Sequence, residues 1–345
     1  MTLRRGIPAL AVVVLGGLLL SGCTEQGAAM PVPTPEFTSS YAAPEPLAIA
    51  PLSGRPIEAG TALNPSIAAK IDNHPAARPQ VGLDTTDIVF EELVEGGLTR
   101  YVGIWQSTIP AELGPVRSIR PMDPDIVSAF GGIIAYSGGQ PRFVQLMKAA
   151  PVYNAIHGQR DTADTFYRTT TKRAPHNVLV KASVVVGQHK NIPAPVQQFG
   201  YSLDTPSSTA AKDGVPSARI TLKFGAASTP AWTWDETSAS WLRFQTGGKA
   251  DTAASGTQLS ATNVVVVRVA VDNSLGVPKT QLIGKGEAWV STGGATVHAS
   301  WSKRTATGRI RLVDANGAAI RLAPGNTWIE LVPSTGTVAF VPPAN

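Results

Sequence analysis

The pattern of apolar and polar positions changes three times along this chain of 345 residues. Residues 1–22 contain a run of uncharged, mostly apolar positions, and residues 23–51 are rich in proline without apolar periodicity. From 52 to 205, short apolar runs alternate with segments that carry helix-start residues. From 206 to 345, β-branched or alternating runs are divided by turn residues. The pattern therefore predicts a leader, a linker and two folded domains.

Residues 52–205 predict a mixed domain, α/β or α+β, because strand-like and helix-like segments are interleaved. The runs 88–94 and 101–105 flank Gly96-Gly97 and read as two strands, or as a strand and a helical turn. Asp123-Pro124 resembles an N-cap followed by proline at the first helical position. Further strands are expected at 67–71 and 133–136, and helices at 124–130 and 141–149.

Residues 206–345 predict a smaller all-β domain, either a sandwich or a barrel. Runs such as "ARITLKF", "NVVVVRVAV" and "TVAFV" are typical of short strands. Asn316-Gly317 between alternating runs predicts a type I′ hairpin. Six of the seven tryptophans lie here, and Trp232 and Trp234 share one face of a strand. Buried, they form the core of the domain; exposed, they stack on sugar rings.

The first 23 residues have the features of a bacterial lipoprotein leader. Arg4 and Arg5 precede an apolar run, residues 7–20, that is shorter than the roughly 18–20 residues a membrane span needs. Leu20-Ser21-Gly22-Cys23 resembles the lipobox, in which the cysteine takes a diacylglycerol. Cys23 is the only cysteine, so it has no intramolecular disulfide partner. We expect a signal peptide over 1–22 and a lipid anchor on Cys23, which places the protein on the outer face of the cytoplasmic membrane.

Charge and composition narrow the choice of partners. The net charge is +5, and without Arg4 and Arg5 the 29 basic residues become 27 against 24 acidic ones. This excess, with no basic stripe interleaved with aromatics, argues against nucleic acid. The proline-rich stalk, residues 23–51, is expected to lift the body away from the bilayer at about 3.1 Å per residue. A cell-envelope component or another envelope protein is therefore the expected partner.

Several strings resemble one family. "KIDNHPAARPQVGLDTTDIVFEELVEGGLTRYVGIWQS", "GPVRSIRP", "FYRTTTKRAPHN" and "GNTWIELVP" closely resemble the YerB-like bacterial lipoproteins. The resemblance covers nearly the whole mature chain. It implies a lipoprotein with an N-terminal domain and a smaller C-terminal domain, and it carries over no biochemical activity and no catalytic residue.

Polar residues of the first domain are concentrated in a few strings beside proline or glycine, where loops display binding groups. Gly114-Pro115 and Pro121 restrict the backbone around Arg117 and Arg120, and guanidinium groups grip carboxylates and phosphates through a planar fork of donors. We therefore expect an anion-binding site. Its candidate residues are Asp72, His74, Arg78, Arg100, Arg117, Arg120, Arg168, Lys172, Arg173, His176 and Asn177.

The same residues allow other interpretations. Arg117 and Arg120 can instead pair with Glu91, Glu92 and Glu95 and hold the domain together. The protein can also be an envelope hydrolase, with one of these glutamates as acid or base and His74 or His176 assisting. A third possibility is a scaffold for another envelope protein.

Metal, cofactor and nucleophile sites are weaker interpretations. Asp72 and His74, two apart, can share a site with His176 and a glutamate, but neighbouring arginines repel a cation and no His-Glu-x-x-His string is present. We expect neither a metal nor a cofactor. Ser137-Gly138-Gly139 follows an expected strand and precedes an expected helix, which suits a nucleophile turn, a phosphate cradle or an ordinary tight turn.

Overall fold

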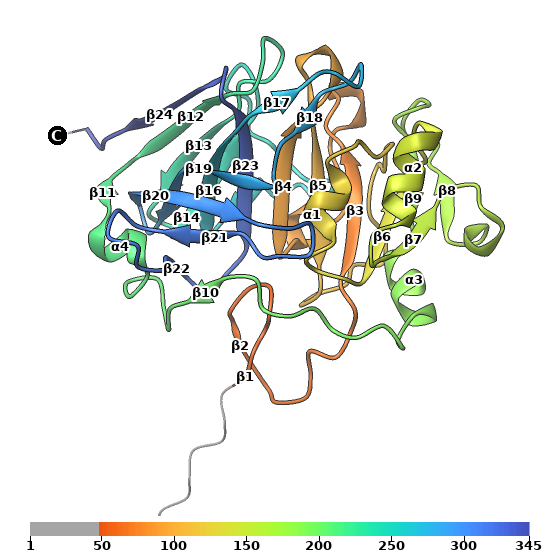
Figure 1. Ribbon diagram of the computed structural model, residues 1–345, viewed down its shortest axis with the longest axis horizontal. Coiled ribbons are helices and arrows are strands. Elements are labelled where there is room, and N and C mark those ends of the chain that lie inside the picture. The colour runs from red at the N-terminus through yellow and green to blue at the C-terminus, as the bar shows by residue number, and fades with distance from the viewer. Residues whose placement is uncertain (1–47, 345) are drawn as a thin grey trace, which may run out of the picture. The chain divides into compact units, whose positions relative to one another are not determined.

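A computed structural model describes residues 48–344 (Figure 1). The predicted signal peptide, the lipidation site Cys23 and the stalk up to residue 47 lie outside the described residues. The last four stalk positions, 48–51, belong to the folded body, because β1 (Ala48–Ile49) pairs with β2 (Pro56–Ile57) and Ala50 is buried. The predicted stalk is therefore too long at this end. Among residues 48–344, no helix has the length and apolar character that crossing a membrane requires.

One twisted sheet of eleven strands runs through both halves of the body (Figure 1). The strands β11, β20, β19, β16, β23, β4, β5, β3, β6 and β7 follow one another in this order, and β21 pairs with β20. The first part contributes β3 (Ile67–Asp72), β4 (Ile88–Leu93), β5 (Thr99–Trp105), β6 (Ile133–Tyr136) and β7 (Tyr153–Ile156). The second part contributes β11 (Val215–Pro216), β16 (Asn263–Val269), β19 (Gly284–Thr292), β20 (Ala295–Lys303), β21 (Arg311–Val313) and β23 (Thr327–Pro333). The two parts join where β23 pairs in parallel with β4.

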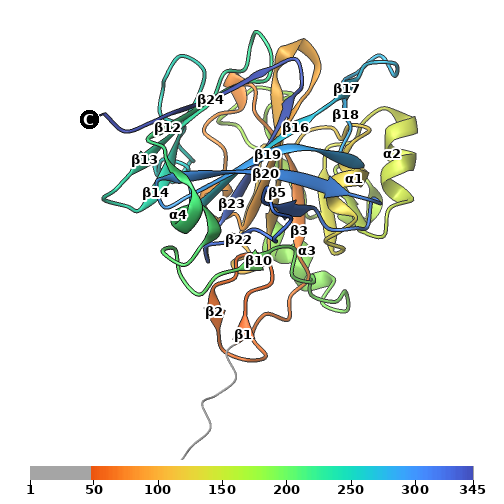
Figure 2. The same cartoon turned by 60° about the vertical axis from the view of Figure 1, so that its left-hand side comes forward.

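A second sheet of five strands packs against one face of the central sheet (Figure 2). Its order is β15 (Ser260–Ala261), β14 (Ser240–Phe244), β13 (Ala231–Asp235), β12 (Arg219–Lys223) and β24 (Thr337–Val341). Trp232, Trp241 and Trp328 are buried between the sheets, and Trp234 packs against them from a partly exposed position. The core interpretation of the tryptophans is thus confirmed.

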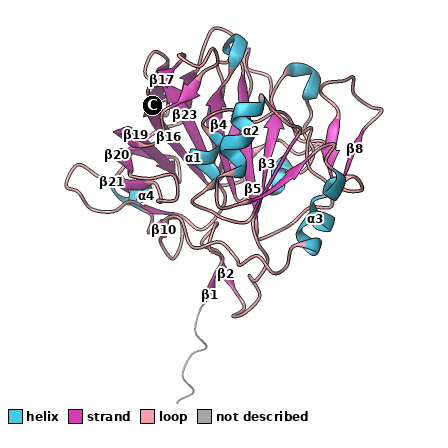
Figure 3. Cartoon of the chain, turned by 45° about the vertical axis from the view of Figure 1, so that its right-hand side comes forward, coloured by secondary structure: helices cyan, strands magenta, loops and turns pink. Residues whose placement is uncertain are grey.

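The helices are few and short (Figure 3). α1 (Asp123–Val127) and α2 (Pro141–Lys148) contribute Ile126, Phe143 and Met147 to the apolar core on the opposite face of the central sheet. Asp123 is not the N-cap of α1 as predicted, because the cap position is Met122. The Asp123 carboxylate instead accepts hydrogen bonds from the Arg120 amide and the Lys70 ammonium. The other α-helices within residues 48–344 are α3 (Ala182–Gln188) and α4 (Thr209–Asp213), and four short 3₁₀-helices cover Pro75–Ala77, Leu83–Thr85, Glu95–Gly97 and Arg160–Thr162.

The predicted fold class is confirmed: a mixed first part precedes a strand-rich second part. The one α-helix among the described residues of the second part is α4, which Ser208 caps through a hydrogen bond from the Ala211 amide. Short pairings complete the body. They are β8 (Phe166–Arg168) with β9 (Val178–Val180), β10 (Gly200–Tyr201) with β22 (Arg321–Leu322), and β17 (Val271–Asp272) with β18 (Lys279–Thr280).

The predicted type I′ turn at Asn316-Gly317 is wrong. Gly317 has φ +81°, but Asn316 is not among the residues with positive φ, as this turn type demands. The Asp314 carboxylate accepts hydrogen bonds from the amides of Asn316 and Ala318, 2.9 and 2.8 Å long. Aspartate at the first position and glycine at the fourth are typical of a type I turn, so the aspartate side chain decides the geometry.

Candidate functional site

Two adjacent glutamates of β4 point to opposite faces of the central sheet, because side chains alternate along a strand. Glu91 stands in register with Tyr101 of β5 and faces the second sheet. Glu92 stands in register with Arg100, which in turn pairs with Asp72 of β3. Each face therefore carries a buried charged cluster of its own.

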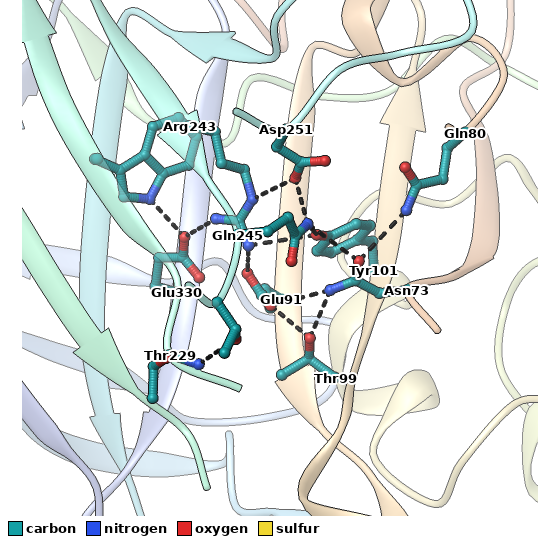
Figure 4. Close-up of polar contacts among 12 residues, drawn as sticks. Asn73, Gln80, Glu91, Thr99, Tyr101, Thr229, Arg243, Gln245, Asp251 and Glu330 are labelled. Carbon is teal, nitrogen blue, oxygen red and sulfur yellow. Dashed lines mark hydrogen bonds and ion pairs between the residues drawn. The ribbon is translucent and has the colours of Figure 1, made fainter. Parts of the chain in front are cut away.

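The cluster facing the second sheet is centred on Arg243, whose side chain is fully buried (Figure 4). Its guanidinium contacts Glu91, and it lies 3.0 Å from Asp251 Oδ2 and 2.8 Å from Glu330 Oε1. The Trp232 indole also donates to Glu330 Oε1, at 2.7 Å. Burial, together with the charge of Glu91, raises the pKa of Glu330 well above its usual range. Both effects favour the protonated form of Glu330, which carries no negative charge for Arg243 to balance.

On the other face, Lys70 of β3 contacts Glu92 and lies 2.7 Å from Asp123 Oδ1. Burial lowers the pKa of Lys70 to about 8, against the opposing effect of Asp123. The second oxygen of Asp123 accepts the Arg120 amide at 2.6 Å. Lys70 therefore anchors the loop that carries Arg120.

A cavity of about 110 Å³ opens beside this second cluster. Its lining comes from the end of β3, the β4–β5 turn, the loop ahead of α1 and the loop ahead of β9. The residues are Asp72, His74, Val94, Glu95, Leu98, Thr99, Arg100, Arg117, Arg120 and His176. Four polar strings of the sequence, within residues 72–78, 91–100, 117–123 and 168–177, thus contribute to one pocket. We call it the arginine pocket.

Backbone pairing brings these loops together. The Arg117 amide donates to the Lys70 carbonyl at the end of β3, and the neighbouring Val116 amide donates to Val178 of β9. On its other side, the Ser137 amide donates to the Arg117 carbonyl and the Ile119 amide to Gly138. The Ser137-Gly138-Gly139 segment therefore supports the arginine loop through its backbone.

Asp72 holds two groups of the arginine pocket. Its Oδ2 lies 2.6 Å from His176 Nδ1 and 3.1 Å from Arg117 Nε. The His74 ring stacks on His176 at 4.3 Å with 14° between the planes. His74 Nδ1 accepts the Ala76 amide, so its Nε2 is the nitrogen that carries hydrogen in the neutral ring.

Arg120 and Arg100 are oriented by the opposite wall. Arg120 Nε donates to Glu95 Oε2 at 2.7 Å, and Arg100 donates to the Ser118 carbonyl at 2.7 Å. Gly96 and Gly97, both with φ +71°, turn the chain between β4 and β5 and bring Glu95 to this position. The ion-pair interpretation therefore holds for Arg120 with Glu95, whereas Arg117 pairs with Asp72 and not with Glu91 or Glu92.

The pocket has an excess of positive charge. Three guanidinium groups face two carboxylates, those of Asp72 and Glu95. Burial and the charges of Arg120 and Arg117 lower the pKa of Arg100 to about 10. Burial and the neighbouring His176 lower the pKa of His74. An anion entering the pocket would relieve this repulsion, which is the electrostatic condition for binding one.

Several candidate residues lie outside the arginine pocket. Arg78 donates to Asn73, and Lys172 Nζ donates to the Pro79 carbonyl at 2.6 Å. Arg168 Nη1 donates to Asn177 Oδ1 at 2.8 Å, and Arg173 is exposed. These five residues come from the predicted strings but do not line the arginine pocket; four of them contact neighbouring residues, and Arg173 is exposed.

The alternative roles given to two glutamates are contradicted. Glu91 and Glu92 are fully buried and paired with Arg243 and Lys70, so neither reaches a substrate or joins Asp72 and His74 around a metal. Within residues 48–344, no group of three or more His, Cys, Asp or Glu side chains is arranged to hold a metal ion.

The sequence analysis did not identify Lys70 and Arg243, the buried cations of the two charged clusters. Lys70 and Arg243 each lie in a strand among apolar neighbours, where a charge needs a buried partner. That mismatch is the signal that finds them. Their partners remain invisible in the sequence, since Arg243 and Glu91 lie 152 positions apart.

This chain belongs to the family described as Protein of unknown function (DUF3048). The model of the family's N-terminal domain matches residues 52–201, and that of its C-terminal domain matches residues 220–329. Together the two cover more than half of the chain, which confirms the family resemblance.

Two comparisons point to one relative in Bacillus subtilis. The curated protein named "Putative lipoprotein YerB" (strain 168) is 27% identical over 296 residues, which cover 82% of this chain and 86% of the relative. The crystal structure of the YerB protein from Bacillus subtilis matches with a TM-score of 0.73 and 22% identity, over 85% of this chain and 99% of that one. This structural likeness shows the fold.

Proposed function

We propose that this protein is a lipoprotein, anchored through Cys23 on the outer face of the cytoplasmic membrane, that binds an anionic cell-envelope component in the arginine pocket. The anchor is supported by the Leu20–Cys23 pattern and by the name of the Bacillus subtilis relative. The binding role rests on one observation, the convergence of Arg100, Arg117 and Arg120 on a single cavity.

The arrangement of donors supports an oxyanion as ligand. The terminal nitrogens of Arg117 make no hydrogen bond to another residue within 48–344, although its Nε faces Asp72. They remain available for a planar, bidentate contact with a phosphate or carboxylate. Asp72 and Glu95 hold two of the guanidiniums in place, so less side-chain freedom is lost on binding.

A second cavity supports a polymer rather than a single ion. It measures about 280 Å³ and is lined in part by Pro75, Arg78 and Pro79 of the loop 74–79, whose His74 lines the arginine pocket. Arg78, Lys249 and the buried Asp251 are its charged lining residues. A chain with repeated phosphate or carboxylate groups can follow this loop and meet cations in both cavities. We infer an anionic wall polymer or glycan.

Replacing Arg117 by alanine is expected to weaken binding of a glycerol-phosphate oligomer by about 10-fold to 100-fold. The reason is that a hydrogen bond to a charged group contributes about 1.5–3 kcal/mol. Titration calorimetry on the full chain in neutral-lipid nanodiscs measures the effect. Arg168→Ala is the matched control, because Arg168 contacts Asn177 outside the pocket.

Unchanged affinity in Arg117→Ala, with an unchanged melting temperature, would remove the arginine pocket as the site. If the parent protein binds neither the oligomer nor the monomer, the scaffold interpretation takes its place. Monomer and oligomer binding with equal affinity would keep the pocket and reject the polymer.

Affinity for a phosphodiester is expected to rise several-fold between pH 7.5 and 5.5. The pKa of His74 lies below its usual range of about 6.5, so the ring is neutral at pH 7. A bound anion favours the protonated ring, and by linkage acid then strengthens binding. Asp72, Glu95, His176 and the three arginines line the same cavity as His74.

The affinity profile of His74→Asn tests this assignment. Asparagine can still accept the Ala76 amide as an N-cap but cannot gain a proton. A shallower pH dependence in this variant is expected. The same steep profile in both proteins would assign the titration to His176 or to another group.

A further inference from the structure

A larger groove, of about 490 Å³, lies where the segment 198–200 ahead of β10 runs beside the β20–β21 hairpin. This volume falls within the roughly 300–1,000 Å³ of small-molecule pockets. None of its lining residues lines the arginine pocket. They are Gln198, Phe199, Gly200, Ser302, Arg304, Gly308, Arg309, Ile310, Arg311, Leu312, Val313, Ala319 and Ile320.

The inner wall of the groove is apolar. Phe199, Leu312 and Ile320 are nearly buried and belong to the core on this side of the central sheet. Behind Phe199 and Ile310 a narrow void continues inward along Phe90 and Phe130. A ligand in the groove therefore meets the apolar side chains of Phe199, Leu312 and Ile320.

The outer rim carries three arginines: Arg304, Arg309 and Arg311. All three are exposed, and none donates a hydrogen bond or forms an ion pair with another residue of the described range. The lining contains neither aspartate nor glutamate. The rim is thus a concentrated, uncompensated positive charge above an apolar wall.

Lys303 holds the loop that carries the rim. Its ammonium donates to the carbonyls of Ala306, at 2.8 Å, and of Gly308. These contacts fix the backbone of the loop 304–309, which lines one side of the groove. The two arginines of this loop are therefore positioned, rather than carried on a free segment.

We propose that this groove binds an anionic amphiphile, a molecule with one long apolar chain and a phosphate or carboxylate head. The chain lies against Phe199, Leu312 and Ile320, and the head is held by Arg309 and Arg311. The apolar wall by itself would also accept an apolar peptide; the unbalanced arginines select a negative head group. This site is independent of the arginine pocket.

Photo-cross-linking tests the proposal. The full chain in neutral-lipid nanodiscs is irradiated with a lysophosphatidylglycerol that carries a diazirine in its acyl chain, and the labelled peptides are mapped by mass spectrometry. We expect labelling within residues 196–201 and 302–320. A diazirine fatty acid replaces phosphate by carboxylate and shows which head group is preferred.

Two comparisons test whether labelling depends on the charge of the probe and on the arginines of the groove. A monoacylglycerol probe with the same chain but no charge is expected to label at least fivefold less, and Arg309→Glu/Arg311→Glu to lose most labelling by the charged probe. Lys285→Glu, an exposed charge reversal on β19, is the control for a charge reversal outside the groove. Equal labelling by the neutral probe, equal loss in the Lys285→Glu control, or labelling outside these residues would overturn the proposal.

Discussion

Replacement of Arg243 by methionine is expected to destabilise the protein by about 3–5 kcal/mol. The side chain is fully buried, forms ion pairs with Glu91 and Asp251, and donates a hydrogen bond to Glu330. Removing one partner of a buried pair is costly because the opposite charge stays behind without compensation. Arg243 also joins β14 of the second sheet to β4 and β23 at the junction of the two parts. The free energy of unfolding from urea titration measures the effect.

Glu330→Gln is the matched control in the same cluster. The raised pKa favours the protonated form of Glu330 in the folded state, and glutamine imitates that form. The unfolded carboxyl group loses its proton near pH 4.5, so the parent loses stability as pH rises above this value. We expect the variant to be at least as stable at pH 7 and to lose less stability from pH 5 to 7. Equal losses in Arg243→Met and Glu330→Gln would contradict this charge assignment.

Replacement of Lys70 by methionine is expected to cost a similar amount, about 3–5 kcal/mol, and to weaken anion binding as well. The substitution leaves Glu92 and Asp123 buried without their cation. Asp123 also holds the Arg120 amide, so the arginine loop loses its anchor. Urea unfolding and calorimetry with the glycerol-phosphate oligomer measure the two effects on one sample.

The double variant Lys70→Met/Glu92→Leu separates charge from packing. Apolar replacement of both partners of a buried pair is often neutral, so this variant is expected to recover the part of the lost stability that comes from Glu92, while Asp123 stays buried without its cation. If it is no more stable than Lys70→Met alone, the loss comes from packing around Lys70. Asp123 is unchanged in both variants, so anion binding reports on the arginine loop separately.

The strands of the central sheet show how well the local sequence pattern predicts the bounds of secondary-structure elements. The run 133–136 was predicted with the bounds of β6, and 67–71 is one residue shorter than β3, because continuous apolar runs between turn residues are typical of buried strands. α2 begins at Pro141 as predicted, since proline suits a first helical position. The turn at Asp314–Gly317 departed from prediction where one side chain competed for the backbone amides.

The sequence predicted which types of residue form the candidate site, but only some of the named residues line the pocket. Arg117, Arg120, His74 and His176 do line one pocket, and polar strings beside proline and glycine indicated this. Arg168 and Arg173 belong to the same strings but lie outside it. Position within a string does not determine the direction of a side chain, which depends on the strand or loop packed against it.

The sequence by itself determined the strand-rich character of the second part, the mixed character of the first and the polar strings that converge on the arginine pocket. These features depend on local periodicity and turn chemistry. Only the tertiary structure decided that β4 and β23 join the parts in one sheet, and that Glu91 and Glu92 pair with Arg243 and Lys70 on opposite faces. Such pairings depend on the register between distant strands, and a register is set by the packing of the whole sheet.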